Sequence, residues 1–492
     1  MSETLWIADR GGTPVPAPEP APVSRWREAT VQVVSGLALC TFTLNALGLA
    51  YILPTVGAIL MFLGFQTLRR ENLWFRRGCI AAALRLGVLC ANLVCYTSVR
   101  LQAWLPRGSD TVVATALLSL SIAICYCLWQ GLMETRAAAG LRARADSAGC
   151  MIVWYLACFG LGVAGYHGGV LAWLLVGALV VILCCLYHCM GEVDGTDYPF
   201  DPPPPRWSGG ALILTVATVL VLGGALGYSV GAGCPMHWAP RDPAEQAGVT
   251  ETRAYLENLG FPAEVLDDLT PEDIAACAGA IQVVVREDDQ PVSSHRLRTG
   301  GDASPVEPEE LLHFVSVAVE VRERQWKLFH HVRWNWNGEQ DFYGTEAMVV
   351  RPVYGTGVGS WIPGSAAPTG RVLCERKGRT YAAPCYSVGD QVGQTSSVFF
   401  GLSPWEAVCG TFSLPRHSQN SRGYVSYSAL GTPEGGGMNS HVSYVHQVNW
   451  FRYPAVTAAE YRTAGAVGNT FWTVQTLMSY YPPDESADCP PF

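Results

Sequence analysis

Residues 31–65 read VQVVSGLALCTFTLNALGLAYILPTVGAILMFLGF, an almost unbroken apolar stretch. As one helix these 35 residues would be about 50 Å long, whereas the hydrocarbon core of a bilayer is only about 30 Å thick. We therefore expect the chain to turn near Asn45 and Gly48, ahead of Pro54, and to cross the bilayer twice within this stretch. A single kinked helix is the alternative.

Further apolar runs follow along the N-terminal half of the chain. Each is about as long as the roughly 20 residues that one transmembrane helix requires. With the divided first stretch, they predict an α-helical multi-pass membrane domain at 29–233 with about seven spans, at 31–48, 51–68, 78–99, 111–132, 148–165, 168–190 and 209–231. If the first stretch is a single span, the count falls to six.

The arginines of this half fall mainly on one side of the predicted spans. If the N-terminus is cytoplasmic, eleven arginines lie in the inner segments and only two, Arg100 and Arg107, lie in the outer loops. Because Arg and Lys resist translocation, this asymmetry predicts a cell-membrane protein with a cytoplasmic N-terminus and an extracytoplasmic region after Gly231. Treating the first stretch as one span gives eight against five and leaves the C-terminal region outside.

The charges of the chain divide unequally at Gly233. The residues before it include 14 Arg or Lys against 12 Asp or Glu, and those after it include 18 against 29, so the second part carries nearly all of the net charge of −9. Nucleic-acid binding requires a basic face that neutralises phosphates, so we expect no nucleic-acid partner. The lipid bilayer is the one partner that the composition predicts directly. Thirty arginines against two lysines are typical of a GC-rich coding sequence and favour a bacterial source.

One Pro-rich segment precedes the predicted membrane domain, and a second lies between its sixth and seventh predicted spans. Residues 1–28 form a polar tail with alternating prolines from Pro14 to Pro22, without the pattern of a cleaved signal peptide, and we expect this tail to be disordered. The loop 191–208 is acidic and contains four consecutive prolines, which favour an extended polyproline II spacer. A cytoplasmic partner with a proline-binding groove is the alternative for this loop.

Residues 234–280 predict a short helical neck after the last span. We expect helices at 250–260 and 262–279, because Thr270 can cap a helix N-terminus and Asp273 completes a capping-box-like pattern. After the neck, the periodicity of the apolar residues changes from helical to alternating.

The alternation is clearest at 326–336, where WKLFHHVRWNW places apolar and polar residues in turn and predicts a strand. The valines at 315–321 alternate in the same way, and the short break between the two segments predicts a β-hairpin. A second hairpin turn is expected at 376–379 and a flexible loop at 435–437. Further strands are expected at 281–286, 345–354, 370–374, 380–386, 396–402, 410–414, 423–430, 441–451 and 470–480.

Many short strands with Gly and Pro turns and few helices are typical of an antiparallel sandwich or jelly roll. Residues 281–492 therefore predict a soluble, extracytoplasmic, mainly β domain. Six cysteines follow the last span, and this even number allows disulfides without revealing which cysteines pair. They are Cys234, Cys277, Cys374, Cys385, Cys409 and Cys489.

Arg85 is the main ionisable residue inside a predicted span. An intramembrane charge suggests a functional site by default. Two other interpretations remain open. Arg85 could snorkel towards the inner face from about two turns away, or 69–85 could form an interfacial helix, with the span beginning later.

Soft metal ligands lie near the inner end of the sixth span. Cys184 and His188, and likewise Cys185 and Cys189, are four residues apart and would share a helix face. This spacing predicts a candidate zinc or copper site. The alternative is three small hydrophobic residues and an interfacial histidine.

Aromatic residues are enriched in the β-rich region. Exposed rings could stack on a sugar or a peptide, and the candidate ligand-binding residues are Trp334, Trp336 and Trp361. Alternatively, these rings fill the core. His330 and His331 would face opposite sides of one strand, so they cannot ligate the same metal, and we expect His330 to be a hydrogen-bonded core histidine.

The sequence contains no H-E-x-x-H motif and no Gly-rich phosphate loop after a strand. We therefore expect no cofactor and favour a binding role over an enzyme. The leading hypothesis is a membrane protein whose outer β domain binds a sugar, peptide or protein in adhesion, sensing or assembly. A transporter, a transporter accessory subunit and a membrane-embedded enzyme are the alternatives.

Overall fold

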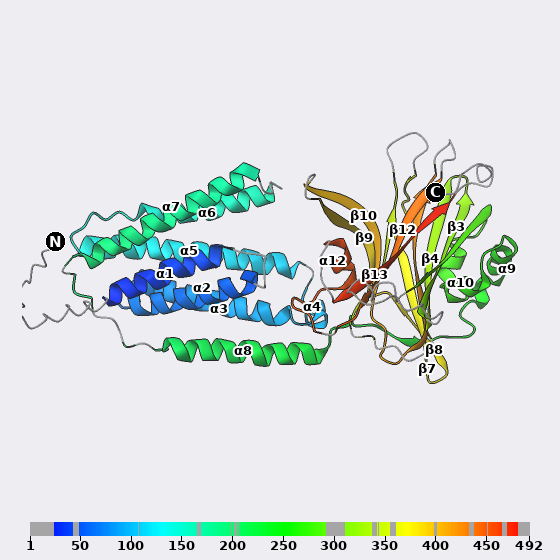
Figure 1. Cartoon of the computed structure of the whole chain (residues 1–492), viewed down its shortest axis with the longest axis horizontal. Coiled ribbons are helices and arrows are strands. Elements are labelled where there is room, and N and C mark those ends of the chain that lie inside the picture. Colours follow the sequence, from blue (N-terminus) through cyan, green and yellow to red (C-terminus); the bar gives the residue numbers. More distant parts are fainter. Residues whose placement is uncertain are drawn as a thin grey trace, which may run out of the picture. The chain divides into compact units, whose positions relative to one another are not determined.

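The computed structural model divides the chain into two compact units (Figure 1). The helical unit contains Met1–Leu93 and Arg107–Leu222, and the β unit contains Val94–Pro106 and Gly223–Phe492. The structure describes residues 24–42, 49–106, 108–164, 169–196, 198–200, 204, 206–291, 310–336, 342, 344–354, 361–397, 401–431, 437–449, 451–464 and 470–480. The tail at 1–23, most of the expected loop at 435–437 and Cys489 lie outside these ranges.

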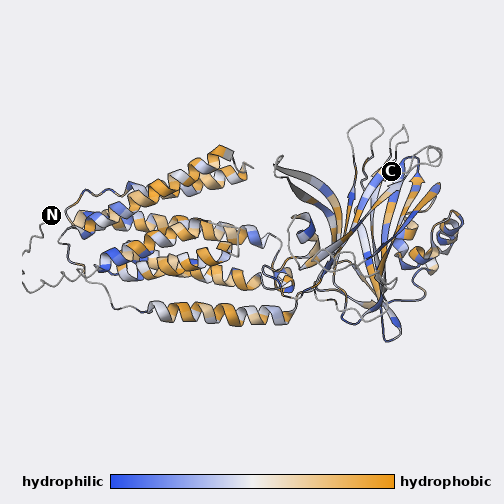
Figure 2. Cartoon of the chain, viewed as in Figure 1, coloured by the Kyte–Doolittle hydropathy of each residue, from blue (hydrophilic) through white to orange (hydrophobic). Residues whose placement is uncertain are grey.

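The helical unit is built from long apolar helices, which Figure 2 colours as predominantly hydrophobic. Among the described residues, all of its helices except α1 are long and apolar enough to cross a membrane, which makes six. The chain is therefore a multi-pass membrane protein. The helices are α1 (Arg25–Thr41), α2 (Leu49–Leu68), α3 (Leu73–Cys95), α5 (Ser109–Ala138), α6 (Asp146–Val163), α7 (Gly169–Asp194) and α8 (Gly209–Val230), with the last residues of α3 and α8 in the β unit.

The apolar stretch 31–65 lies in two helices rather than in one kinked helix. Helix α1 ends at Thr41 and α2 begins at Leu49, close to the expected turn. Pro54 lies inside α2, within the span expected at 51–68. Helix α1 is 17 residues long and begins at Arg25, so the last residues of the expected tail are helical.

Glycines allow α1 and α2 to approach closely. A Cβ atom on Gly57 would lie 2.7 Å from the carbonyl oxygen of Gly36, and a Cβ atom on Gly36 would lie 2.7 Å from the carbonyl oxygen of Gly57. A Cβ on Gly64 would lie 2.6 Å from the side chain of Val33. The two helices therefore run in opposite directions and pack through small residues, as transmembrane helices commonly do.

Polar contacts tie the helix ends together. Arg136 of α5, which is buried, forms an ion pair with Glu192 of α7 at 2.7 Å and donates to the carbonyl of Cys189 at 2.8 Å. The indole nitrogen of Trp26 in α1 donates to the carbonyl of Met190 at 2.7 Å. Helix α7 is therefore held by two other helices where it ends.

Antiparallel pairing connects the strands of the β unit into two sheets. The larger sheet has the order β1 (Ala239–Pro240), β8 (Arg379–Pro384), β7 (Thr369–Arg376), β11 (Gln419–Leu430), β4 (Gln325–Trp336), β3 (Glu310–Arg322) and β2 (Gln282–Pro291), with β6 (Ile362–Pro363) paired to β11. The smaller sheet has the order β13 (Phe471–Tyr480), β12 (Met438–Gln447), β5 (Glu346–Pro352), β10 (Gly401–Phe412) and β9 (Ser387–Ser397).

Strand alternation gives the larger sheet two buried faces. Leu328 and Val332 of β4 lie in a core shared with Met348 of the smaller sheet. Phe329, which points the other way, packs with Val317 beneath the neck helices. These helices are α9 (Thr250–Asn258), α10 (Ala263–Asp268) and α11 (Pro271–Ala275).

The expected hairpin before and after residues 323–325 is confirmed, because β3 and β4 pair antiparallel. The turn at 376–379 is also confirmed, and Lys377 and Gly378 adopt positive φ angles of 50° and 70° there. The single helix expected at 262–279 is two helices, α10 and α11. Thr270 caps α11 as expected, accepting a hydrogen bond from the backbone nitrogen of Asp273.

The strand expected at 396–402 is wrong, because β9 ends at Ser397 and β10 begins at Gly401. The sequence of β9, SVGDQVGQTSS, contains few residues with strand propensity and gave no signal. Its pairing with β10 over eleven register positions supplies the missing stability. Helix α12 (Ala458–Thr463) was also missed, because six residues are too few to show a helical period.

The β unit includes a short segment that lies between α3 and α5 in sequence. Helix α4 (Val99–Ala103) belongs to this segment. Gln102 donates to the carbonyl of Ala455 at 2.8 Å, and the Ala455 nitrogen donates to the carbonyl of Tyr96 at 2.7 Å. Val99 and Ala455 are buried with Cys234, so residues far apart in sequence complete one small cluster.

Replacing Gly57 with Val tests the close approach of α1 and α2. The new side chain would clash with the Gly36 carbonyl and Cys40, so the free energy of unfolding should fall by roughly 1–3 kcal/mol. Thermal unfolding of the full chain in detergent measures the change. Gly87→Val in α3 is the matched control, because no atom lies within 4 Å of a Cβ added there. Equal unfolding temperatures of the two variants would contradict the packing argument.

Candidate functional site

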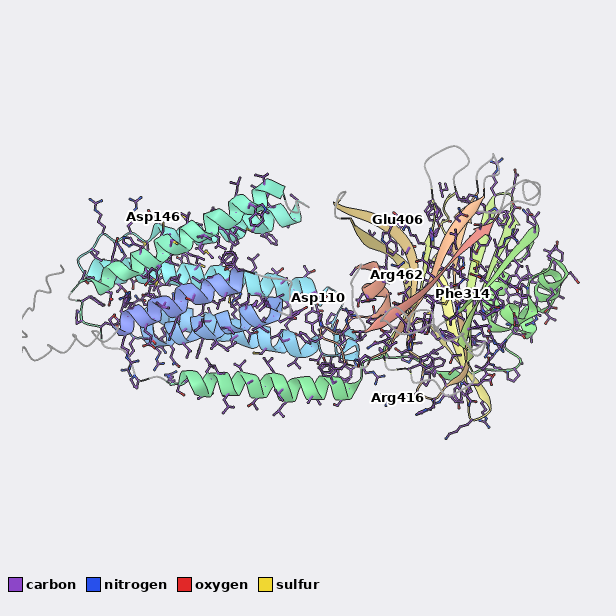
Figure 3. All side chains as sticks on the ribbon, in the orientation of Figure 1. Asp110, Asp146, Phe314, Glu406, Arg416 and Arg462 are labelled. Atoms are coloured by element: carbon purple, nitrogen blue, oxygen red, sulfur yellow. The ribbon has the colours of Figure 1, made fainter. Side chains whose placement is uncertain are left out.

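A pocket of about 230 Å³ lies in the β unit between its two sheets. Strands β9 and β10 and the end of β5 supply one wall, and β11 and the segment around 363–368 supply the other. Glu406 on β10 marks this region in Figure 3. The volume is below the roughly 300–1,000 Å³ of pockets that hold drug-sized ligands, so the pocket suits a single side chain or a small group.

The 363–368 wall is fixed to β11 by hydrogen bonds with Ser428. The backbone nitrogen of Gly364 donates to the Ser428 carbonyl at 2.9 Å, and that of Ala366 donates to the Ser428 hydroxyl at 3.1 Å. A Cβ on Gly364 would lie 2.4 Å from the same hydroxyl, so this position requires glycine. Just before this wall, Trp361 packs against Trp326 with ring centroids 5.2 Å apart.

Two carboxylates give the pocket a negative charge. Asp390 of β9 is opposite Val408 in register, and Glu406 of β10 is opposite Val392. The two acidic residues are therefore diagonal neighbours on one face of the hairpin. Both are exposed, and within the described part of the chain neither has an ion-pair partner.

Tyr354 is a half-buried member of the same pocket. Burial raises the pKa of Tyr354, and the negative charges of Asp390 and Glu406 raise it further. The phenol therefore stays protonated and can donate a hydrogen bond. No basic side chain is among the lining residues that the structure describes. This arrangement can bind a cationic group and offers it both charge and a polar contact.

Two of the three tryptophans predicted to bind a ligand, Trp334 and Trp361, pack in the core of the β unit. Trp334 is buried and meets Phe412 and Tyr444 edge-on, with ring centroids 6.2 Å and 4.9 Å apart. Trp361 is also buried. The side chain of Trp336 lies outside the described residues. Binding through Trp334 or Trp361 stays a prediction, and it would require the core to open.

The predicted metal ligands lie along α7. Cys184, Cys185 and His188 are exposed, and the ring of His188 lies 3.5 Å from Glu192. Cys189 is half-buried, and its thiol lies 3.8 Å from the carbonyl of Arg144. Within the residues that the structure describes, no three His, Cys, Asp or Glu side chains come together in a way that could hold a metal ion.

Arg85 lies in an uninterrupted helix, because α3 runs from Leu73 to Cys95. The helix therefore continues without a break on both sides of Arg85. Only 7% of the residue is exposed, and its Nε and Nη1 atoms are buried without a hydrogen-bond partner in the described structure. Most of the side chain is therefore enclosed by the helical unit.

His330 and His331 face opposite sides of β4, as predicted. His330 lies in the core, with its Nδ1 atom 2.8 Å from the Ser316 hydroxyl and its ring stacked on Tyr427. His331 lies under the neck, with its Nε2 atom 2.9 Å from Asp268. The pairing of Ser316 and His330 resembles a nucleophile and base, but both residues are fully buried. No substrate can reach them in this structure.

Ion pairs between the neck and the larger sheet were not predicted. Asp273 of α11 binds Lys327 at 2.6 Å and accepts hydrogen bonds from the hydroxyls of Tyr424 and Thr369. Burial opposes ionisation of Asp273, but Lys327 and these hydrogen bonds outweigh it and lower the pKa of the carboxyl group. The partners are 54 to 151 residues apart in sequence, so no local motif reveals them.

A serine motif lies at the end of α8. Gly227 to Gly231 read GYSVG and match the G-x-S-x-G pattern of nucleophile elbows. That motif requires a sharp turn between a strand and a helix. Ser229 lies instead in the last turn of a helix and donates to the Leu226 carbonyl at 2.7 Å. The match does not provide an exposed elbow.

The described cysteines that follow the last predicted span are all unpaired and buried. Burial raises the pKa of Cys374 to about 11 and the pKa of the others to about 12, so these thiols remain protonated at neutral pH. They are packing residues and not nucleophiles. The five cysteines are Cys234, Cys277, Cys374, Cys385 and Cys409.

Comparison with known proteins adds no functional assignment. No family model matches the chain, and a search of curated proteins finds no match. The acidic pocket and Arg85 are therefore interpreted from their own chemistry.

His330 makes the stability of the β unit depend on pH. Burial lowers the pKa of His330 to about 3 from an ordinary value of 6.5. Between these values the unfolded chain binds a proton that the native state excludes, so acidification destabilises the fold by at most about 1.4 kcal/mol per pH unit. We expect His330→Gln to flatten this slope between pH 6.5 and 4.5.

Urea unfolding of the full chain in detergent at several pH values measures the slope. The matched control is His237→Gln, because His237 is exposed. Asp268 and Asp273 have lowered pKa values, so their contribution is lost only below the ordinary aspartate pKa of 3.8, outside this window. An unchanged slope in the His330 variant would contradict the prediction.

Proposed function

We propose that the chain is a multi-pass membrane protein that presents its β unit outside the cytoplasm and there binds a peptide or protein through a basic side chain. The acidic pocket supports this proposal. Sensing and assembly of other exported proteins are the roles that fit such binding. The β unit would then be an antiparallel sandwich in which an opening between the sheets receives the ligand.

Electrostatics favour a cationic ligand. Asp390 and Glu406 face the pocket without basic neighbours among its described lining residues, and a protonated Tyr354 adds a polar contact. The part of the chain after Gly233 contains 18 basic and 29 acidic residues, a difference of −11. A negative field of this kind accelerates encounter with positive ligands and repels negative ones.

The proposed topology has seven spans with the N-terminus inside. Helices α1 and α2 would form a hairpin across the bilayer, because they are antiparallel and packed through Gly36 and Gly57. The eleven-to-two asymmetry of arginines supports the orientation. With an odd number of spans, the β unit then lies outside the cytoplasm.

Binding of an acetylated Gly-Lys-Gly peptide with a neutral fluorophore tests the pocket. Fluorescence anisotropy with the full chain in detergent should detect binding of this peptide and weaker binding of Gly-Glu-Gly. The double variant Asp390→Asn, Glu406→Gln should bind the lysine peptide roughly tenfold more weakly, because two partly solvated charge contacts are lost. High salt should weaken binding by the wild-type chain.

Glu323→Gln is the matched control for this experiment. Glu323 is also an exposed acidic residue of the β unit, but it lies in the turn between β3 and β4 and does not line the pocket. The affinity of the Glu323→Gln variant for the lysine peptide should equal that of the wild type. Equal binding of the two peptides, or an unaffected double variant, would contradict the proposed ligand class.

Protease protection tests the orientation of the β unit. Trypsin added to intact cells should cut a C-terminally tagged chain, because Lys377 lies in the exposed turn between β7 and β8. A cytoplasmic protein of the same cells should stay intact and serves as the control. If the tag is lost only after lysis, the β unit is cytoplasmic and the proposed topology is wrong.

A further inference from the structure

Arg85 lies near the middle of α3 and far from the ends of the helix. It is twelve residues from Leu73 in a helix of 23 residues, which corresponds to about 18 Å along the axis. The guanidinium is therefore held at mid-helix inside the helical unit, where only 7% of the residue is exposed. A charge buried among apolar helices is costly.

The surroundings of Arg85 come from three other helices. Cys40 of α1, Cys125 of α5 and the phenol of Tyr155 in α6 lie within electrostatic range of its guanidinium. Tyr155 lies 2.9 Å from the Thr41 hydroxyl, which already donates to a carbonyl of its own helix. These groups are thiols and hydroxyls, so they cannot neutralise the cation.

No described carboxylate of the helical unit lies in the middle of its helix, as Arg85 does. Each is found in a loop or in the first or last two turns of its helix. They are Glu28, Glu71, Asp110, Glu134, Asp146, Glu192 and Asp194. Arg136 is equally buried, but it pairs with Glu192 and two carbonyl oxygens.

A buried cation without partners is not stable by itself. Burial removes its hydration, and only an opposite charge or several hydrogen bonds can offset that loss. Two nitrogens of Arg85 have no partner within the described part of the chain. A bound anion would supply the negative charge that the described side chains around Arg85 do not provide.

We infer that Arg85 holds an oxyanion inside the helical unit. The planar guanidinium offers five N–H donors and fits a carboxylate or phosphate through paired hydrogen bonds. The anion is either the headgroup of a membrane lipid or a free small anion. The site is separate from the acidic pocket of the β unit and has the opposite charge preference, so the two can be tested independently.

Thermal unfolding of the full chain, delipidated in an uncharged detergent and free of phosphate, tests this site. Inorganic phosphate, acetate and phosphatidylglycerol are added separately. At least one should raise the unfolding temperature of the wild-type chain by several degrees, because a ligand that binds only the native state stabilises it. None of them should stabilise Arg85→Leu.

The lipid and free-anion sources give different results. Stabilisation by phosphatidylglycerol but not by phosphatidylcholine, phosphate or acetate identifies a lipid headgroup, and native mass spectrometry should then show that lipid retained by the wild type and lost from Arg85→Leu. Stabilisation by phosphate or acetate identifies a free anion. A wild-type chain that none of these probes stabilises would overturn the inference.

Two further variants separate binding from general folding effects. Arg77 is an exposed arginine of the same helix, and its guanidinium lies 4.8 Å from the ring centroid of Trp74. The Arg77→Leu variant should keep the full stabilisation by the added anion. Arg85→Lys keeps the charge but loses the planar fork, so its response should be weaker by about tenfold in apparent affinity. Equal loss of response in Arg77→Leu and Arg85→Leu would also overturn the inference.

Discussion

The middle of strand β4, from Leu328 to Val332, is buried on both faces, so a polar side chain there is stabilised by a partner inside the protein. Leaving one such group unsatisfied costs roughly 1–3 kcal/mol, a large part of the stability of a domain. His330 contacts Ser316 in the core, and the Nε2 atom of His331 contacts Asp268 under the neck. The second contact, with the ion pair between Lys327 and Asp273, fixes the neck helices on the sheet. Polar residues of β4 therefore contribute to the position of the neck, together with Tyr424 of β11 and Thr369 of β7.

Arg136 and Arg85, two buried arginines of the helical unit, differ in whether the chain supplies polar partners for their charge. Arg136 is satisfied by Glu192 and by backbone carbonyls near the ends of the helices, where acidic residues and free carbonyls are available. Arg85 lies at mid-helix, where the backbone carbonyls are engaged by their own helices and the described carboxylates are distant. One residue is explained by the chain alone, and the other requires a ligand.

The sequence predicted the elements whose signal is local. The apolar helices follow from run length, β4 follows from alternation, and the cap of α11 follows from Thr270. Strand β9 and the acidic pocket were missed, because Asp390 and Glu406 become neighbours only through the register of two strands. Aromatic enrichment could not distinguish surface from core either. Trp334 and Trp361 are buried because a second sheet and a packed loop cover them, which depends on contacts distant in sequence.

The segment Val94–Pro106 belongs to the β unit although it is synthesised between two helices of the other unit. The polypeptide therefore passes between the units three times. The buried cluster that contains Val99 also contains Ala455, which lies more than 350 residues later in the chain. The cluster is therefore complete only after Ala455 has been synthesised. A fragment that begins after α8 would lack Val99 and so part of the interior of the β unit. The helical unit and the β unit are therefore made as one product and are not interchangeable modules. An evolutionary exchange of either part would have to carry a piece of the other.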